Sequence, residues 1–204
     1  MRFPPATHLV VMVHGTREHA EGLRSEVEAV LSNVGLRLNK EKTSVCHIDE
    51  GFDFLGFRIQ RQQKRGSHKT FVYTWPSRKS LSSIMAKVKA ITKQGTSKSL
   101  PDLLHQLNKV LRGWTTYFQY GVSKATFRYL SHYTWLRVNG WLRRKFRRST
   151  WKDRRRRYLG NGWRPQQDGV ILFNSGAVPV SRYRYRGTKI PSPWDRWIRA
   201  IAEG

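Results

Sequence analysis

The sequence has a single cysteine, Cys46, so an internal disulfide bond and a zinc site built on several cysteines are excluded. A reducing, cytoplasmic setting is therefore expected. No apolar run approaches the roughly 20 residues that a membrane-spanning helix needs. The N-terminal residues MRFPPATH lack the apolar core of a signal peptide. We expect no membrane segment and no export signal.

Acidic residues are scarce in most of the chain. Its 204 residues include 39 Lys and Arg but 13 Asp and Glu, a net charge of +26. Residues 1–53 hold 6 basic and 8 acidic residues, whereas residues 54–204 hold 33 and 5, a difference of +28. Charges at this density repel one another unless a polyanion neutralises them, which predicts a nucleic-acid partner. A membrane surface is the rival partner, but Arg and Trp are mixed along the predicted helices and form no separate lipid-facing stripe.

Apolar residues recur at helical spacing in three segments, which predicts a three-helix bundle. One helix begins after Ser77, and a second begins near Pro101 and stops before Gly121. The third follows Ser123, a predicted N-cap, and Asn139-Gly140 is a candidate kink. Its expected buried face consists of Phe127, Leu130, Thr134, Val138, Trp141 and Leu142. The simplest interpretation of this region is a packed helical core with solvated arginines.

Shorter patterns predict β-structure on both sides of the bundle. Residues 9–13 (LVVMV) and 35–45 are expected strands around a helix that Thr16 caps. GFDFLGFRI and FVYTW are expected to form a hairpin with a basic tip. Beyond a short helix at 151–158 and a loop at 160–167, a second hairpin is expected to join residues 170–173 and 178–180. The predicted fold class is α+β.

Several strings resemble the reverse transcriptases that group II introns encode. GWTTYFQYG, WLRRKF and WKDRRRRYLG resemble their maturase-specific region, domain X. GLRLNKEKTSV and GFDFLGFRI resemble the end of the polymerase palm and the hairpin that positions the primer. The resemblance implies a palm remnant with hairpin at 1–75, a thumb and maturase-specific helical domain at 76–160, and a basic linker-like segment at 161–204. In this family the helical bundle grips the intron RNA.

The sequence departs from this family at the polymerase active site. Relatives carry a Tyr-Ala-Asp-Asp box where this chain has Pro5-Ala6-Thr7-His8. Two-metal polymerisation needs carboxylates that hold metal ions about 4 Å apart. We therefore expect no catalytic residue, no protein-bound metal and no enzyme activity. Asp49, Glu50 and Asp53 form a local acidic cluster, which we interpret as a solvated turn in preference to a metal site.

The leading hypothesis is a truncated, RNA-binding group II intron maturase that assists folding and splicing of its intron RNA in a cytoplasmic ribonucleoprotein. No cofactor is expected on the protein, and magnesium is expected with the RNA. DNA and an upstream polymerase fragment are further candidate partners. Two alternatives stay open: a subunit of a split RNA-directed DNA polymerase completed in trans, and a non-functional remnant of a decayed mobile element.

The residues expected to contact RNA are basic side chains of the predicted helices and of the segment SRYRYRGTK, together with one tyrosine. Alternation in that segment would place its arginines on one face of a strand. The full set is Arg112, Lys124, Arg128, Arg137, Arg143, Arg144, Lys145, Arg147, Arg148, Lys152, Arg154, Arg155, Arg156, Arg157, Arg182, Tyr183, Arg184 and Arg186. Arginine and lysine would neutralise phosphates, and aromatic rings would stack on unpaired bases.

Overall fold

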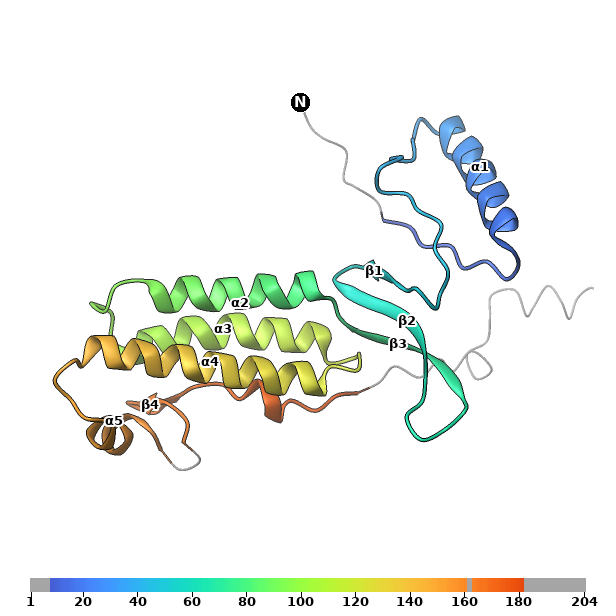
Figure 1. Cartoon of the computed structure of the whole chain (residues 1–204). Helices are drawn as coiled ribbons and strands as arrows, with labels where there is room; N and C mark the ends of the chain where they lie inside the picture. The colour runs from blue at the N-terminus through green and yellow to red at the C-terminus, as the bar shows by residue number, and fades with distance from the viewer. Residues whose placement is uncertain (1–7, 161–162, 182–204) are drawn as a thin grey trace, which may run out of the picture. The chain divides into compact units, whose positions relative to one another are not determined.

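The computed structural model describes residues 8–160 and 163–181 (Figure 1). The chain divides into two compact units, Met1–Glu50 and Gly51–Gly204. Helices and small antiparallel sheets together make an α+β fold, as the sequence predicted. The expected division into three functional parts stays a prediction.

Over its described residues 8–50, the first unit contains one helix, α1 (Arg17–Asn33), which begins and ends where the sequence predicted. The Thr16 hydroxyl accepts a hydrogen bond from the His19 backbone N–H, and His19 Nδ1 accepts one from the Thr16 N–H. At the other end Gly35 adopts a φ of 76°, the left-handed conformation that favours glycine after a helix. None of the side chains of α1 is buried. Local capping therefore defines this helix more than packing does.

The two strands predicted for the first unit are wrong. Residues 9–13 form no strand, and the side chain of Met12 is 66% exposed. Residues 35–45 instead contain a turn, in which Asn39 Oδ1 accepts hydrogen bonds from the backbone N–H groups of Glu41 and Lys42. A strand needs a neighbour for its backbone hydrogen bonds, and residues 8–50 supply none. High β-propensity alone was not enough to form a strand in these segments.

The second unit begins with a three-stranded antiparallel sheet in the order β1-β2-β3. β1 (Phe52–Phe54), β2 (Phe57–Gln63) and β3 (Thr70–Pro76) confirm the predicted hairpin and add one short strand to it. The extra turn lies at Leu55-Gly56, where φ is 46° and 82°. Positive φ at both central residues is typical of a two-residue hairpin turn. GFDFLGFRI therefore folds back on itself instead of forming one strand.

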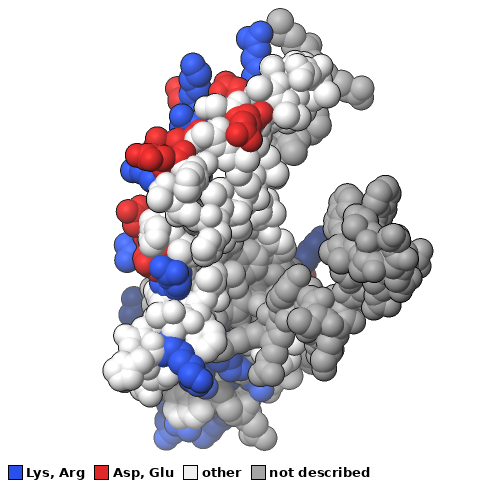
Figure 2. Space-filling view, turned by 90° about the vertical axis from the view of Figure 1, so that its right-hand side faces the viewer, with Lys and Arg blue, Asp and Glu red and all other residues white. Residues whose placement is uncertain are grey.

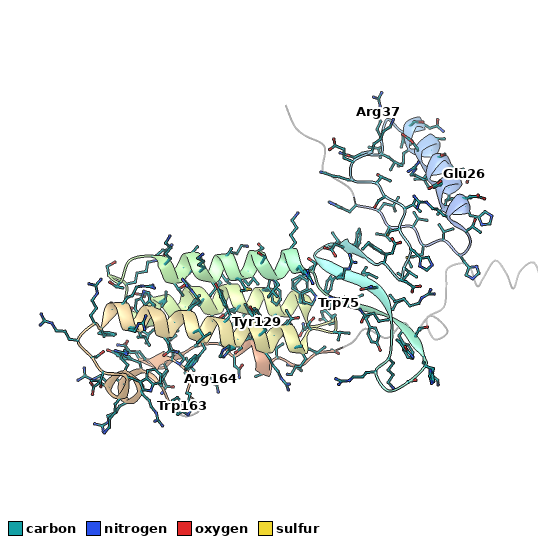
Figure 3. The ribbon with its side chains drawn as sticks, viewed as in Figure 1. Glu26, Arg37, Trp75, Tyr129, Trp163 and Arg164 are labelled. Carbon is teal, nitrogen blue, oxygen red and sulfur yellow. The ribbon has the colours of Figure 1, made fainter. Side chains whose placement is uncertain are left out.

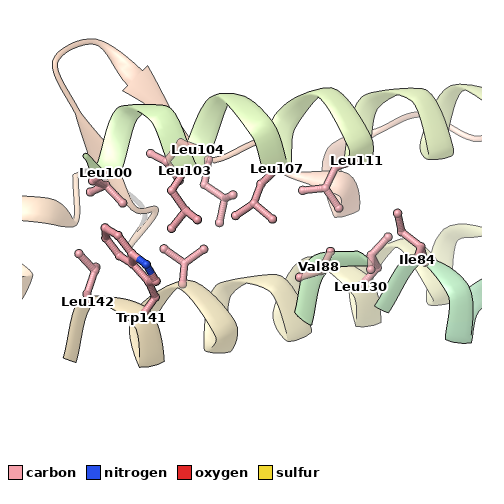
Figure 4. Close-up of a cluster of buried hydrophobic side chains, with 12 residues drawn as sticks. Ile84, Val88, Leu100, Leu103, Leu104, Leu107, Leu111, Leu130, Trp141 and Leu142 are labelled. Atoms are coloured by element: carbon pink, nitrogen blue, oxygen red, sulfur yellow. The ribbon is translucent and has the colours of Figure 1, made fainter. Parts of the chain in front are cut away.

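Three helices follow and lie side by side: α2 (Arg78–Lys93), α3 (Leu100–Phe118) and α4 (Lys124–Lys145) (Figure 1). This is the predicted bundle. Its buried apolar side chains come from all three helices and from one residue of a later segment (Figure 4). They are Ile84, Val88, Leu100, Leu103, Leu104, Leu107, Leu111, Leu130, Val138, Trp141, Leu142 and Leu172. The six residues predicted as the inner face of α4 are all buried.

Serine residues precede all three helices, but they act differently. Ser77 and Ser99 are side-chain caps, because their hydroxyls accept hydrogen bonds from the Ser80 and Asp102 backbone N–H groups. Ser123 occupies the predicted N-cap position of α4 but makes no cap hydrogen bond. Its buried hydroxyl instead donates to the Phe118 carbonyl, 2.7 Å away. Ser123 therefore closes the turn between α3 and α4. The α4 helix continues through Asn139-Gly140 without a break.

The sheet is attached to one end of the bundle. The Val122 N–H donates to the Thr74 carbonyl at 2.6 Å, and the Tyr117 hydroxyl donates to the Leu55 carbonyl at 2.8 Å. The Phe57 ring packs on Phe118 with centroids 4.7 Å apart. The sheet and the bundle therefore share backbone hydrogen bonds as well as aromatic contacts.

The segment after α4 was predicted only in part. The helix α5 (Trp151–Tyr158) forms as expected, but the hairpin expected from residues 170–173 and 178–180 is wrong. The strands are β4 (Gln166–Gln167) and β5 (Val170–Ile171), and they turn at Asp168-Gly169 with φ of 50° and 77°. Asp-Gly is a stronger hairpin-turn signal than Asn-Ser-Gly, and the prediction overlooked it.

Residues 172–181 pack on the bundle instead of pairing with a strand. Asn108 on α3 donates to the Ile171 carbonyl at 2.8 Å and accepts from the Phe173 N–H at 2.7 Å. Ser131 on α4 donates to Asn174 Oδ1 beside a short 3-10 helix, η1 (Ser175–Ala177). The Asn108 side chain of α3 therefore satisfies backbone groups that a hairpin would have paired. The alternating segment at 182–189 lies outside the described residues.

The stability of the bundle is predicted to depend on Trp141, whose side chain is fully buried. Trp141→Ala should lower the free energy of unfolding by about 3–5 kcal/mol, because it removes apolar burial and leaves a cavity. Tyr129→Ala is the matched control: Tyr129 lies on the same helix but is 52% exposed, and its substitution should cost within about 0.5 kcal/mol. Urea denaturation measures both values. Equal costs would contradict the assignment of Trp141 to the core.

Candidate nucleic-acid interface

Positive charge in the bundle is almost unopposed. Residues 76–160 contain 21 Lys and Arg against two acidic residues, Asp102 and Asp153. Both carboxylates accept hydrogen bonds at helix starts, Asp102 from Ser99 and Asp153 from Thr150. Figure 2 shows one face of the chain with Lys and Arg in blue and Asp and Glu in red. The bundle therefore presents a basic surface without internal neutralisation.

Two of the predicted RNA-binding arginines hold the bundle together. Arg137 Nε donates to Thr92 Oγ1 at 3.1 Å, and Arg144 donates to the Thr92 backbone carbonyl at 2.5 Å. Thr92 is fully buried in the last turn of α2. The carbonyl groups at a helix C-terminus carry partial negative charge, which cations stabilise. Arg137 and Arg144 therefore tie α4 to the end of α2.

Lys145 makes a similar connection one residue later. Its Nζ donates to the backbone carbonyls of Thr96 and Lys98, in the connection between α2 and α3. The ammonium also lies 5.2 Å from the centre of the Trp141 ring, within reach of a cation–π interaction. Lys145 is thus half-buried and engaged on several sides. Its first role is to position the end of α4.

Three more predicted residues contact the segment at 170–180. The Arg112 guanidinium lies over the Phe173 ring, 4.7 Å from its centre, and Lys124 Nζ donates to the Val178 carbonyl at 3.1 Å. Arg128 packs beside Gly176 on η1. These contacts hold the segment on α3 and α4. Arg112 and Arg128 remain exposed, so both can also face a ligand.

The short helix α5 arranges its arginines in different ways. Arg154 donates to the backbone carbonyl and hydroxyl of Ser149, and the Arg155 guanidinium lies over the Trp163 ring, 3.9 Å from its centre. The remaining predicted cations at the end of α4 and on α5 are exposed: Arg143, Arg147, Arg148, Lys152, Arg156 and Arg157. Arg147 and Arg148 also line an open hollow of about 660 Å³ between Thr96 and Ser149. The ends of α4 and α5 therefore offer the most available positive charge.

The sequence missed an exposed aromatic pair at the same end of the molecule. The rings of Trp151 and Trp163 stack with centroids 6.4 Å apart and an angle of 24° between their planes. Figure 3 shows Trp163 and Arg164 beside α5. Residues 160–167 were predicted only as a loop, and a tryptophan between glycine and arginine was the signal that could have identified this site. Arg182, Tyr183, Arg184 and Arg186 lie outside the described residues.

The acidic cluster of the sequence does not act as a group in the described structure. His47 Nδ1 lies 3.3 Å from Asp49 Oδ2, whereas Asp53 pairs with Arg58 at 3.4 Å. Across residues 8–160 and 163–181, no group of three or more His, Cys, Asp and Glu side chains is placed to hold a metal ion. None of the described helices is long and apolar enough to span a membrane.

The start of α5 is predicted to depend on pH through its cap. Hydrogen bonds from the Thr150 hydroxyl and then from its backbone N–H lower the pKa of Asp153 below the ordinary 3.8. A lowered folded-state pKa means that this stabilisation is complete above the ordinary value and is lost as the pH falls through the lowered one. Backbone NMR shifts of residues 151–158 should stay helical near neutral pH and lose helicity in that acid range.

Thr150→Ala removes one hydrogen-bond donor and the hydroxyl acceptor of the cap, so it should reduce the helicity of α5 even near neutral pH. Ser99→Ala makes the same kind of change at the start of α3 and should leave the shifts of α5 as they are. An α5 that is unchanged in Thr150→Ala would contradict the role of this cap.

Comparison with known proteins shows what the helical region is similar to. Residues 81–159 match the sequence model of the family described as "Group II intron, maturase-specific domain". The match starts within α2 and ends immediately after α5, so it includes all of α3, α4 and α5. Protein YkfC of Escherichia coli (strain K12) is 36% identical over 91 residues, which cover 41% of this chain and 24% of that protein. The chain thus spans about a quarter of the length of this relative.

The family match covers most of the bundle and the basic helix, which carry most of the predicted RNA-binding residues, and it confirms the resemblance to the maturase-specific region. Residues 81–159 of the chain are thus similar to the maturase-specific domain of group II introns.

Proposed function

We propose that the chain binds group II intron RNA through the exposed cations at the ends of α4 and α5 and assists the folding and splicing of that RNA. The observation that supports this most is the coincidence of the maturase-specific match with 21 basic and two acidic residues in residues 76–160. In this proposal the RNA and its magnesium ions carry out splicing. The protein acts in the cytoplasm as part of a ribonucleoprotein.

The proposed mechanism is mechanical and electrostatic. Contacts of Arg137, Arg144 and Lys145 with the end of α2 and the connection after it fix the end of α4 on the bundle. The neighbouring exposed arginines are therefore presented from a rigid support, so less conformational entropy is lost when RNA binds. Each phosphate that they neutralise releases condensed counterions, which favours binding at low salt. RNA segments brought together on this surface would be stabilised in their folded arrangement.

We further propose that the chain has no polymerase activity of its own. The sequence Pro5-Ala6-Thr7-His8 carries no carboxylate where the related polymerases have two aspartates. Without carboxylates to hold two metal ions, the attacking and leaving oxygens of nucleotide transfer are not stabilised. Magnesium belongs to the RNA in this proposal, and DNA is a secondary polyanionic ligand.

A second function is favoured by the first unit. Its helix α1 buries none of its side chains, and Val30 and Val34 are 66% and 70% exposed. An apolar helix face of this kind is expected to pack against other protein. A polymerase fragment that supplies the rest of a palm would cover it, and the chain would then be a subunit of a split RNA-directed DNA polymerase. A remnant of a decayed mobile element is the remaining alternative, and it predicts no preference for intron RNA.

RNA binding is predicted to depend strongly on salt. If six to ten phosphates are contacted, affinity should fall by roughly 10³ to 10⁵ between 50 and 200 mM salt. The variant R147Q/R148Q/R156Q/R157Q removes four exposed positive charges from the ends of α4 and α5. It should weaken binding to all RNAs alike. The slope of log affinity against log salt concentration should become less steep by about 0.7–0.9 for each phosphate that is no longer neutralised. Fluorescence anisotropy over a salt series measures both.

The matched control is R24Q/R37Q/K40Q/K42Q, which removes the same charge from exposed positions of the first unit. It should leave the salt slope nearly unchanged. Equal effects of the two variants would mean that net charge alone drives binding. A wild-type chain that binds group II intron RNA no better than random RNA would contradict the maturase function.

The purified chain is predicted not to extend a DNA primer on an RNA template with magnesium and nucleotides, because the metal-binding carboxylates are absent from residues 5–8. A gel-based extension assay tests this, with a boiled sample as the control. Templated extension above that control would refute the absence of polymerase activity. Extension that appears only after addition of a separate polymerase fragment would favour the split-enzyme alternative.

A further inference from the structure

Trp163 is a large apolar side chain that the fold keeps at the surface. It is 48% exposed, and its neighbour Trp151 is 44% exposed. Trp141 of the same unit, by contrast, is fully buried. Exposed tryptophan is costly in water, so a pair of such rings held together marks a candidate binding surface.

The backbone at Trp163 is held in a conformation that tryptophan disfavours. Its φ is 61°, in the left-handed region where bulky residues are true outliers. Contacts from three directions maintain it. The Trp135 Nε1–H donates to the Trp163 carbonyl at 2.7 Å, the Trp163 N–H donates to the Gly160 carbonyl at 3.0 Å, and the Gly160 N–H donates to the Arg164 carbonyl at 3.1 Å. Strain maintained in this way by its surroundings is typical of functional sites.

The Trp163 ring is also fixed by its neighbours. The Arg155 guanidinium lies over one face, 3.9 Å from the ring centre, and the Trp151 ring stacks with it at 6.4 Å. A ring held by a cation and a second aromatic loses little rotamer entropy when a ligand stacks on it. The guanidinium of Arg155 is thereby turned toward tryptophan, which makes it a positioning residue more than a free phosphate ligand.

The charge around this pair selects the class of ligand. Lys152, Arg156, Arg157 and Arg164 are exposed on the same helix and loop, and Asp153 is held by the Thr150 cap. A ligand that offers a flat apolar face next to phosphate groups complements tryptophan and arginine at once. Unpaired nucleotides have both features, because each base has a face that stacks on aromatic rings and each linkage has a phosphate.

We propose that Trp163, supported by Arg155 and Trp151, is a stacking platform for an unpaired RNA base, flanked by the phosphate-binding arginines of α5. The proposal rests on the proposed RNA-binding function and adds to it a site and a preference for single-stranded over duplex RNA. Duplex RNA keeps its bases stacked inside the helix and offers this platform only phosphates.

Trp163→Asn tests the platform, because asparagine tolerates a positive φ but has no aromatic face. Its thermal midpoint should equal or exceed that of the wild type. Its affinity for a single-stranded RNA of about 12 nucleotides should fall by roughly 5- to 150-fold, the equivalent of ~1–3 kcal/mol for one stacked base. Its affinity for a duplex of the same sequence should change by less than about twofold, as for surface substitutions in general. Trp163→Phe should retain more affinity than Trp163→Asn.

Tyr129→Asn is the matched control, since Tyr129 is an exposed aromatic on α4 (Figure 3) that is 52% exposed. It should leave single-strand affinity within about twofold of the wild type. A single strand with abasic sites supplies the complementary change in the ligand. The wild type should bind the abasic strand about as weakly as Trp163→Asn binds the normal one, and the two changes together should cost little more than either alone.

The outcomes separate this site from the general function. Normal single-strand affinity in Trp163→Asn, with the steep salt dependence retained, would refute the platform and leave RNA binding intact. A wild-type chain that binds no RNA at any salt would refute both. Equally weakened binding of single-stranded, abasic and duplex RNA would show that Trp163 acts on phosphate contacts instead of bases. Polyglutamate that displaces RNA in a Trp163-dependent way would identify an acidic protein as the ligand and overturn the proposal.

Discussion

The arrangement of the second unit depends on the burial of one apolar stripe, that of α3, between α2 and α4. Leu104, Leu107 and Leu111 are fully buried. At about 25 cal/mol per Å² of apolar surface, each buried leucine of this kind contributes roughly 1.5–3 kcal/mol. The stripe fixes where α2 and α4 lie, and α4 in turn determines where the basic end begins. The packing of uncharged side chains thus determines where the positive charges of this domain lie.

The shortage of carboxylates changes how the cations of this domain are used. In most proteins arginine and lysine near a core pair with Asp or Glu. Here Arg144 and Lys145 donate to backbone carbonyls of Thr92, Thr96 and Lys98, and Arg112 stacks on Phe173. Carbonyl oxygens and aromatic faces accept a cation without neutralising it. The domain can therefore fix its cations in place and still keep the full positive potential that attracts a polyanion.

How well each element could be predicted depended on how far apart in the sequence its interacting residues lie. The helices of the bundle were predictable because their apolar residues repeat every three to four positions and serines precede them. The strand predicted at residues 9–13 and the hairpin predicted at residues 170–180 do not form, because strands depend on a partner that sequence patterns do not identify. The position of residues 172–181 on the bundle depends on hydrogen bonds of Asn108, a polar residue of α3 more than 60 positions away. Such a contact leaves no local pattern.

The residues of the candidate site could likewise be predicted only in part from the sequence. Sequence composition identified the cations, because charge counts need no structure, yet it could not separate Arg144 from Arg143. Both are exposed arginines of the last turn of α4, but Arg144 is bound to the Thr92 carbonyl. Removing Arg144 leaves a carbonyl at the end of α2 without this donor, whereas removing Arg143 changes only surface charge. Reduced RNA affinity in an Arg144 variant would therefore mix stability with binding. The cations that measure recognition are those whose side chains the fold does not use, and structure alone distinguishes them.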